Sequence, residues 1–267
     1  MSLAVCATPI GNLEDVTLRV LRELAEADLV LCEDTRRTRI LLDRHGITAS
    51  LKSYHEHNEA ARTAEVLPRL EAGERMALTS DAGLPGVSDP GARLISAALD
   101  AGVQVTVLPG ASAVETALVA SGLIGERYQF VGYLPRGART REELWAELAR
   151  WPHSVVAFES PRRLPASLAS LAAAMPGRPV AVCRELTKKF EEVIRGTAAE
   201  VAEVVSEPPK GEITLVLGEF EPAGGDEDAA FGAVAELVEA GAGRKQAADV
   251  VARVTGLSRN KLYRASL

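Results

Sequence analysis

The sequence is poor in cysteine and in aromatic residues. Three cysteines occur among 267 residues, at Cys6, Cys32 and Cys183, and no two of them form a CxxC pair. This wide spacing argues against a disulfide framework and against a zinc cluster. Each cysteine stands in an apolar run, which favours buried small hydrophobic side chains. Aromatic residues make up 4% of the chain, so the core has to be built mainly from Val, Leu, Ile and Ala.

Several familiar segments are also missing. No apolar run approaches the roughly 18 residues that a membrane span needs. The chain begins with a strand-like run, LAVCA (3–7), rather than a charged leader, so we expect a cytoplasmic protein without a signal peptide. No GxGxxG follows that first strand, which argues against a nicotinamide or flavin Rossmann site. The phosphate-loop pattern GxxxxGK[ST] is absent as well, so ATP chemistry is not expected.

Charge is distributed unevenly along the chain. The net charge is −7, which is unfavourable for contact with nucleic-acid phosphates. Residues 241–267 nevertheless contain six basic residues and a single acid, Asp249. The pattern indicates a basic tail on an acidic body, and the length suggests about two domains before that tail.

Short apolar runs alternate with helical patterns through the first half of the chain. Runs that are apolar on both faces, separated by helices, are typical of a parallel sheet covered on both sides. We expect strands at 3–7, 29–32, 75–79 and 103–108, with helices at 16–25, around 40–42 and at 59–70, 93–99 and 113–120.

The pattern then restarts and predicts a second α/β unit with a mixed sheet. Its expected strands are 128–134, 154–159, 180–186, 191–196 and 213–220, with helices at 140–150 and 198–205. We expect domains at 1–123 and 124–221, and a linker with a helical tail at 222–267. The stretch PAGGDED (222–228) is the linker. The helices beyond it resemble a helix-turn-helix unit, and the alternative is a small cap packed on the body.

The loop SDAGLPGVSDPG (80–91) is the most specific segment. It follows a predicted strand, and loops at the carboxyl ends of parallel strands are where open α/β sheets bind small molecules. Its glycines permit positive φ and close approach of a ligand. We expect Asp89 to cap the following helix and Pro90 to take its first position. In LPGASA (108–113), Ser112 is either a simple N-cap or part of an anion-binding helix start.

Four polar clusters accompany these loops: CEDTRRTR (32–39), YHEHNE (54–59), FESPRRL (158–164) and RELTKKFEE (184–192). On an extended segment His55 and His57 would share one face. Two histidines without a third fixed ligand are weak grounds for a metal, so we expect none.

Taken together, the motifs resemble a known family. Eight segments occur in order, namely ATPIGNLEDVTLR, CEDTR, SYHEHNE, SDAGLPGVSDPG, LPGASA, GYLPR, FESPRRL and CRELTKKFEE. This succession, from about Ala7 to Gly196, resembles the ribosomal RNA small subunit methyltransferase I family of the tetrapyrrole methylase superfamily. Tetrapyrrole-modifying members usually carry a Gly-Asp-Pro-type loop where this chain has Asp81-Ala82-Gly83. That departure favours the RNA-modifying branch.

The resemblance implies a fold, a cofactor and a reaction. The fold would be two α/β domains of the class III methyltransferase type, with S-adenosyl-L-methionine folded in the cleft between them. The reaction would be 2′-O-methylation of a cytidine in the decoding region of 16S rRNA, on free RNA or the 30S subunit, by a homodimer. The implied cofactor contacts are Pro9, Ser80, Asp81, Ala82, Gly83, Val87, Ser112, Ala113, Glu159 and Leu186.

A ribose hydroxyl needs a proton acceptor before it can attack a methyl group. The candidates are Asp34, Glu33 and His55, which the sequence does not rank. Arginine suits phosphate contacts, and the candidates for RNA binding are Arg36, Arg136, Arg162, Arg163 and Lys188. Two alternatives remain open: a sister methylase acting on a tetrapyrrole or on a modified histidine of a translation factor, and a non-catalytic regulator that senses a ligand.

Overall fold

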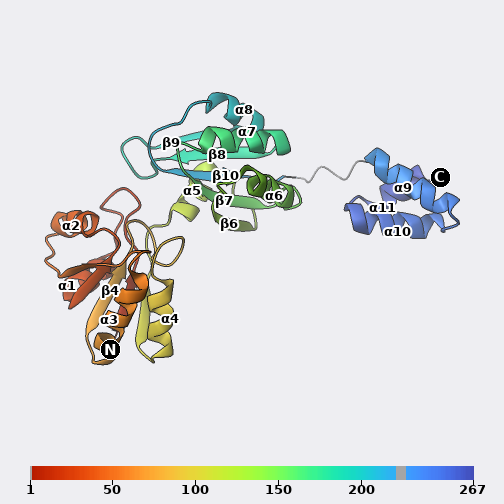
Figure 1. Ribbon diagram of the computed structural model, residues 1–267. Helices are drawn as coiled ribbons and strands as arrows, with labels where there is room; N and C mark the ends of the chain where they lie inside the picture. Colours follow the sequence, from red (N-terminus) through yellow and green to blue (C-terminus); the bar gives the residue numbers. More distant parts are fainter. Residues whose placement is uncertain (1, 221–226) are drawn as a thin grey trace.

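The computed structural model describes residues 2–220 and 227–267, and its body contains two separate five-stranded sheets (Figure 1). The strands of the first sheet are β1 (Ser2–Cys6), β2 (Leu29–Cys32), β3 (Leu51–Ser53), β4 (Arg75–Thr79) and β5 (Gln104–Leu108). Their order is β3-β2-β4-β1-β5, and every pair is parallel. The predicted parallel sheet is confirmed. The three-residue strand β3 was not predicted, because so short a run has no readable period.

Helices connect these strands and cover both faces of the first sheet. They are α1 (Leu18–Glu26), α2 (Thr35–Arg44), α3 (Glu59–Glu71) and α4 (Ala92–Asp100), and a fifth helix, α5 (Ala113–Ser121), follows β5. One face packs Leu3, Leu31 and Leu78 against residues of α3 and α4. The other face packs Ala4 and Val30 against α1 and α2. Burial of strand side chains on both faces explains why these strands are apolar throughout.

The second sheet is mixed, as the sequence predicts. Its strands are β6 (Tyr128–Tyr133), β7 (Ser154–Glu159), β8 (Pro179–Arg184), β9 (Glu192–Thr197) and β10 (Ile213–Leu217), in the order β6-β7-β10-β8-β9. Only β6 and β7 are parallel, and the other pairs are antiparallel. Its helices are α6 (Ala138–Leu148), α7 (Leu164–Ala174) and α8 (Ala198–Val204). These helices pack on one face of the sheet around a core that includes Trp145 and Leu168.

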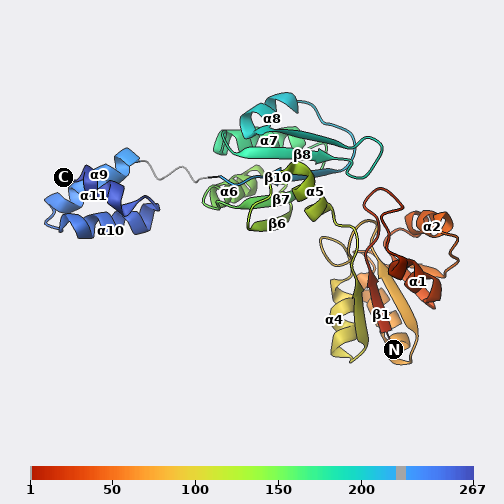
Figure 2. The same ribbon diagram turned by 180° about the vertical axis from the view of Figure 1, so that it is seen from behind.

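Helix α5 follows the first sheet in the chain but packs on the second. Its residues Val114, Ala117 and Leu118 join a cluster with Val156 of β7 and Val216 of β10. Figures 1 and 2 show α5 beside the second sheet from both sides. The helix therefore covers the face of the second sheet that α6, α7 and α8 leave open, and it ties the two α/β units together.

The tail consists of α9 (Glu227–Glu239), α10 (Arg244–Thr255) and α11 (Arg259–Ala265). The predicted linker lies outside the described residues as far as residue 226. The tail has a core of its own, in which Val234 packs with Val251 and Leu262, and Leu237 and Val238 border it. Figure 1 shows the three helices as a cluster apart from both sheets. The apolar stripe of α9 is thus covered by α10 and α11 rather than by the body.

The three cysteines are buried and unpaired, as predicted. Burial, and to a lesser extent the charge of Glu23, raises the pKa of Cys6 to about 12, so its thiol is inert at neutral pH. Across residues 2–220 and 227–267, no helix has the length and apolar character needed to cross a lipid bilayer.

Candidate functional site

The site begins where β1 and β4 end, because parallel neighbours present their loops at the same edge. The two loops hydrogen-bond to each other as a short antiparallel bridge between Thr8 and Gly83. The N–H of Thr8 donates to the Gly83 carbonyl (2.9 Å), and the N–H of Gly83 donates back to Thr8 (3.0 Å). Gly83 has φ +79°, a conformation that favours glycine. The first loop and the 80–91 loop therefore form one rigid floor.

A cavity of about 700 Å³ opens above this floor, between loops of the first sheet and strands of the second. Its size lies within the range of about 300–1,000 Å³ that is typical of ligand pockets. Eight of the ten predicted cofactor contacts line it: Asp81, Ala82, Gly83, Val87, Ser112, Ala113, Glu159 and Leu186. The other two, Pro9 and Ser80, line a smaller adjoining cavity of about 210 Å³. The structure thus gathers residues that are far apart in sequence into one region.

Asp81 connects the floor of the cavity to α2. Its carboxylate accepts a hydrogen bond from the backbone N–H of Asp34 (3.0 Å) and pairs with Arg37 (3.4 Å). Both Asp81 and Arg37 line the two cavities. Asp81 therefore lies between the two cavities, and its contacts with Asp34 and Arg37 hold its carboxylate in place.

The expected roles of Asp89 and Pro90 are wrong. Helix α4 starts at Ala92, and its N-cap is Gly91 with φ +137°. Pro90 stays in the loop, where its carbonyl accepts a hydrogen bond from Gly86 (3.2 Å). Asp89 instead lines the large cavity, and its carboxylate has no hydrogen-bond or ion-pair partner among the described residues. Burial, followed by the charges of Glu33 and Asp81, raises the pKa of Asp89 to about 7. Sequence patterns gave no sign of this environment.

The three predicted proton acceptors stand in different surroundings. Glu33 lines the large cavity, and burial, together with the charge of Asp81, raises its pKa. Asp34 caps α2 and pairs with Arg36 (2.7 Å), whose hydrogen bonds lower the pKa of Asp34 to about 2. Among the residues lining either cavity, neither Asp34 nor His55 is found. Only Glu33 of the three faces the ligand space.

His55 lies in a turn, not on the extended segment that the sequence suggested. Its backbone N–H donates to the Asn58 side chain (2.9 Å), and this bond bends the chain after β3. The Asn58 amide also contacts Nε2 of His55 (3.1 Å). Over the part of the chain that the structure describes, no three His, Cys, Asp or Glu residues gather closely enough to hold a metal ion.

Glu59, from the same cluster, anchors the end of the 80–91 loop. Its carboxylate accepts hydrogen bonds from the Tyr54 hydroxyl and from the backbone N–H of Gly91, both at 3.1 Å. Tyr54 is buried and also contacts Thr63 (3.0 Å). The YHEHNE segment therefore supports the loop rather than supplying a ligand-facing histidine.

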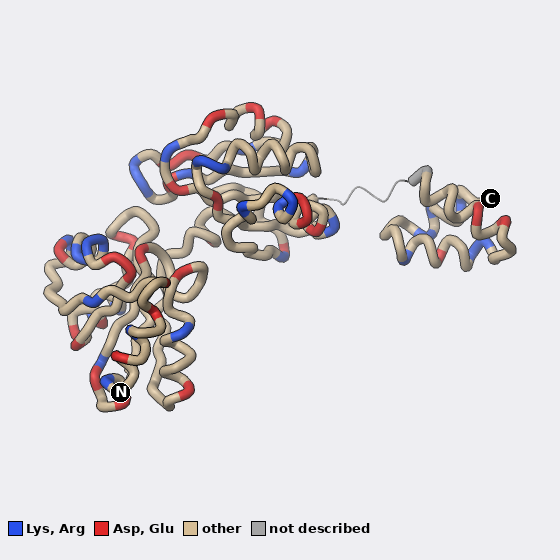
Figure 3. Tube along the Cα trace, in the orientation of Figure 1, with Lys and Arg blue, Asp and Glu red and all other residues tan. Residues whose placement is uncertain are grey.

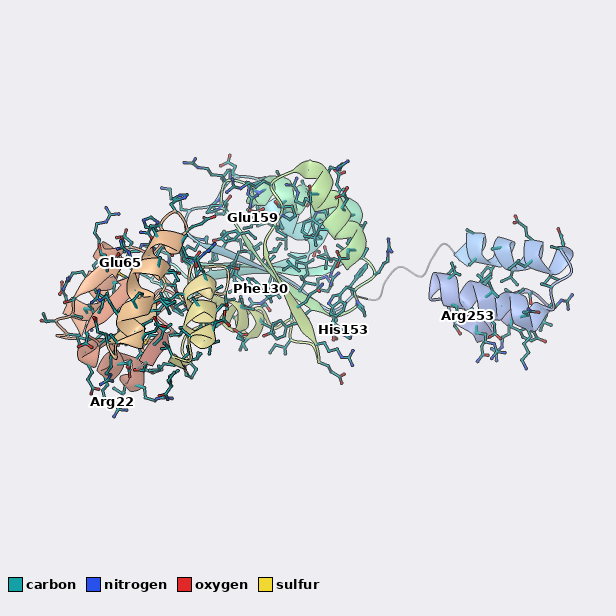
Figure 4. The ribbon with its side chains drawn as sticks, turned by 60° about the horizontal axis from the view of Figure 1, so that its bottom comes forward. Arg22, Glu65, Phe130, His153, Glu159 and Arg253 are labelled. Atoms are coloured by element: carbon teal, nitrogen blue, oxygen red, sulfur yellow. The ribbon has the colours of Figure 1, made fainter. Side chains whose placement is uncertain are left out.

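Glu159 ends β7 with its side chain fully buried. It pairs with Arg163 (2.5 Å) and accepts hydrogen bonds from the N–H of Ser160 and the hydroxyl of Ser167, both at 2.6 Å. Figure 4 shows Glu159 in the part of the second unit that adjoins the first. Glu159 also lines the large cavity. The guanidinium of Arg163 is occupied by its ion pair with Glu159.

Aromatic side chains form one wall of the large cavity, which the sequence reasoning missed. Tyr128, Phe130, Tyr133 and Phe158 all line it. Phe158 meets Phe130 and Tyr133 edge-to-face, with ring centroids 4.9 and 5.5 Å apart. Figure 4 shows Phe130 close to the first unit. Because the chain has so few aromatic residues, their occurrence in YQFVGY (128–133) and AFE (157–159) was the sequence signal that could have indicated this wall. Such a wall suits a planar heterocycle.

Basic side chains flank the cavities. Figure 3 shows Lys and Arg gathered on α2 and on the loop between β8 and β9. Lys188 lines the small cavity but pairs with Glu185 (2.9 Å) and Glu212 (2.8 Å). Arg136 and Arg162 are exposed and have no ion-pair partner among the described residues. These two arginines are the predicted RNA contacts with the least competition from nearby carboxylates.

Comparison with known proteins places this fold in a recognised class. Residues 2–202 match the family model described as Tetrapyrrole (Corrin/Porphyrin) Methylases. The solved methyltransferase CobJ is 21% identical with a TM-score of 0.62, over 82% of this chain and 93% of that one. Uroporphyrin-III C-methyl transferase from Thermus thermophilus, complexed with S-adenyl homocysteine, is 19% identical with a TM-score of 0.59 and is covered over 98% of its length. The predicted fold class is confirmed: it is the two-unit α/β fold of the class III methyltransferases.

More similar relatives narrow the class. Ribosomal RNA small subunit methyltransferase I of Mesorhizobium japonicum is 44% identical over 100% of this chain and 91% of that protein. The protein of the same name from Thermotoga maritima is 42% identical over 80% of this chain and 97% of its own length. The chain therefore belongs to the tetrapyrrole methylase superfamily and, within it, to the ribosomal RNA small subunit methyltransferase I family.

Proposed function

We propose that this protein transfers a methyl group from S-adenosylmethionine to the 2′-hydroxyl of a cytidine in the decoding region of 16S rRNA. The observation that carries the proposal is the large cavity. Motif loops from the first unit and strand ends from the second meet around one space that holds carboxylates, glycines and an aromatic wall. The relatives named as small-subunit rRNA methyltransferases support the substrate class.

The residues present fit S-adenosylmethionine. Phe130 and Tyr133 line the cavity and supply aromatic surface for an adenine, and Gly83 leaves the floor of the cavity without a side chain. The Ser112 hydroxyl is bonded to Glu115 rather than to the backbone, so the first N–H groups of α5 are not capped by it. Such N–H groups suit a carboxylate. When bound, the cofactor supplies an electrophilic methyl group on a sulfonium.

Methyl transfer needs alignment of donor and acceptor more than it needs a metal. What the protein must add is a proton acceptor for the ribose hydroxyl. Of the three predicted acceptors, Glu33 fits best because it alone lines the cavity. Asp89 faces the same space with an unpaired carboxylate, so we add it as the fourth candidate. Asp34 and His55 then have structural roles. Asp34 caps α2, and His55 lies in the turn that precedes α3.

The RNA would lie across both units. Arg36, Arg136, Arg162, Arg163 and Lys188 remain the proposed phosphate contacts. Arg136 and Arg162 have the clearest access, because Arg36, Arg163 and Lys188 are each paired with a carboxylate. The resemblance also implies a homodimer, which sedimentation would test.

The decisive experiment offers labelled S-adenosylmethionine to the protein with 30S subunits, free 16S rRNA or tetrapyrrole precursors. We expect label in one nucleotide of 16S rRNA and resistance of that position to alkaline cleavage, because a 2′-O-methyl group blocks it. Label in a tetrapyrrole, or cofactor binding without transfer to any substrate, would contradict the proposal. Repeating the assay in EDTA tests the metal-free expectation, provided that the RNA stays folded.

A further inference from the structure

The β8–β9 loop begins with the segment Glu185–Lys188, which we call the strap. The backbone of the strap has an unusual conformation. Glu185 has φ +52° and Thr187 has φ +64°. Threonine is branched at Cβ, and for such a residue a positive φ is a genuine outlier. Conformations of this kind are unfavourable and persist only where the surroundings enforce them. The strap also touches both cavities, since Leu186 lines the large one and Lys188 the small one.

The second unit holds the strap at its first residue. The N–H of Glu185 donates to the Glu212 carbonyl (3.0 Å), and the N–H of Glu212 donates to the Glu185 carboxylate (2.9 Å). A Cβ at Gly211 would collide with the Glu185 side chain. These contacts fix the start of the strap against the loop before β10. They do not involve Thr187.

Thr187 is held from both units: its backbone N–H donates to the carboxylate of Glu191 in the second unit (2.6 Å), and its side chain contacts the first unit. The backbone N–H of Asn12, in the loop after β1, donates to the Thr187 hydroxyl at 3.0 Å. A Cβ at Gly11 would lie 2.6 Å from that hydroxyl oxygen and 2.8 Å from the Leu186 carbonyl. Gly11 is therefore required for the close approach of the two chains. The loop after β1 in the first unit therefore contacts Thr187, a residue of the second unit with a strained backbone.

We propose that Thr187 is a positioning residue for the cofactor. Its hydroxyl, held by Asn12, keeps the strap in its strained form and Leu186 against the large cavity. The proposal rests on the proposed cofactor but not on the identity of the methyl acceptor. It predicts that cofactor affinity depends on a contact between the two units that does not itself touch the cavity.

Calorimetry with S-adenosylhomocysteine on the full chain tests this, because binding needs no RNA. Thr187→Val keeps the shape and removes the acceptor, and we expect its Kd to rise about tenfold, the effect of losing roughly 1.4 kcal/mol. Thr187→Ser keeps the hydroxyl and should bind within about threefold of the wild type. The melting temperatures of the two unliganded variants should agree within a few degrees. Equal affinity of Thr187→Val and wild type, equally weak Ser and Val variants, or a Val variant that melts much earlier would each overturn the proposal.

Gly11→Ala provides a second variant that leaves the strap chemically unchanged. The added methyl should push the strap away and weaken binding to a similar degree. Because both changes break one contact, their effects should not add in the double variant. Additive losses would overturn the proposal. A wild-type protein that bound no S-adenosylhomocysteine would overturn both this inference and the proposed function, whereas binding without methyl transfer to RNA would count against the proposed substrate alone.

Discussion

Carboxylates that are close together in this protein differ widely in acidity. The Asp34 carboxylate accepts three hydrogen bonds from Arg36, two from the guanidinium and one from the backbone N–H, and these lower its pKa to about 2. Asp89, by contrast, is partly buried, has no partner among the described residues and has a pKa of about 7. A carboxylate that titrates near neutrality can accept a proton at physiological pH and release it again. The chemistry at this site depends on such local differences.

The pH dependence of methyl transfer should identify the acceptor. The deprotonated carboxylate is the active form, so we expect the rate to rise with pH through an inflection near 7, the pKa of Asp89. Asp89→Asn should remove that inflection and lower the rate about 10²-fold or more. Glu33→Gln should keep the inflection but move it to lower pH, because one negative neighbour is gone. If the inflection persists in Asp89→Asn, another residue is the proton acceptor.

Asp89 should also affect stability. Its pKa is higher in the folded protein than in the unfolded chain, so the ionised form destabilises the fold; the cost is complete above about pH 7 and shrinks gradually as the pH falls from 7 toward about 4, the ordinary aspartate pKa. Asp89→Asn should therefore raise the melting temperature at pH 8, by the equivalent of roughly 1–3 kcal/mol. Asp100→Asn, at an exposed position, is the control and should change nothing. An unchanged melting temperature in Asp89→Asn would show that its carboxylate is well solvated.

Asp81 is the residue we expect to matter most for cofactor affinity. It lines both cavities, and its carboxylate is already oriented by Arg37 and the N–H of Asp34. Asp81→Ala should weaken S-adenosylmethionine binding by about 1–3 kcal/mol, the usual cost of losing a hydrogen bond to a charged group. Calorimetry measures this, with Asp100→Ala as the control. Unchanged affinity would move the cofactor away from this loop.

At the scale of elements, one buried arginine connects several segments of the second unit at the end opposite to the cavity. Arg178, just before β8, is fully buried and donates to the carbonyls of Leu148 (2.7 Å), His153 (2.8 Å) and Gly218 (3.1 Å). These carbonyls belong to the end of α6 and to the segments that border β7 and β10. Burial lowers the pKa of its guanidinium, which still remains charged at neutral pH.

Replacing this arginine should destabilise the protein without reaching the site. Arg178→Met removes the side-chain donor from three carbonyls, although the Leu148 carbonyl keeps the bond from the N–H of Trp151 (3.1 Å), and we expect a loss of about 3–5 kcal/mol in the free energy of unfolding. Denaturant unfolding measures it, with the exposed Arg150→Met as the matched control. Below the transition, cofactor affinity should stay normal because the cavity lies at the other strand ends. A loss under about 1 kcal/mol would mean that other donors reach these carbonyls.

At the scale of the whole molecule, the body and the three-helix tail are independently packed, and the basic excess lies in residues 241–267, the last part of the tail. Among the described residues, the buried side chains of the tail core all come from α9, α10 and α11. Arg244, Lys245, Arg253 and Arg264 are exposed on it. Its apolar stripe is already covered, so the tail has no need to pack on the body, and we propose that it docks RNA.

Removing the tail should separate RNA binding from cofactor binding. A chain ending at residue 222 should keep its melting temperature and cofactor affinity, because neither cavity includes tail residues. Its RNA affinity should fall and depend less on salt, by nearly one unit of slope in log K against log salt for each lost phosphate contact. The full chain with Gln at the four exposed positions should behave in the same way. Normal RNA binding by both variants would refute the docking role.

The sequence by itself determined the strands other than β3 and most helices, because the period of apolar residues is a property of each segment alone. It also determined that the 80–91 loop ends a buried strand, and motif resemblance gave the fold class. Helix α7 was not anticipated, since LPASLASLAAA is apolar and small on every side and has no distinct face.

Only the tertiary structure decided which residues meet. Asp89 looks like a helix cap in sequence, yet the loop turns it into a cavity where burial and two carboxylates change its acidity. Phe130 and Phe158 are ordinary strand residues until the second sheet brings them together opposite the 80–91 loop. The contact of Asn12 with Thr187 joins positions 175 residues apart. Burial and electrostatic environment are sums over such distant contacts, so a local pattern of residues contains no record of them.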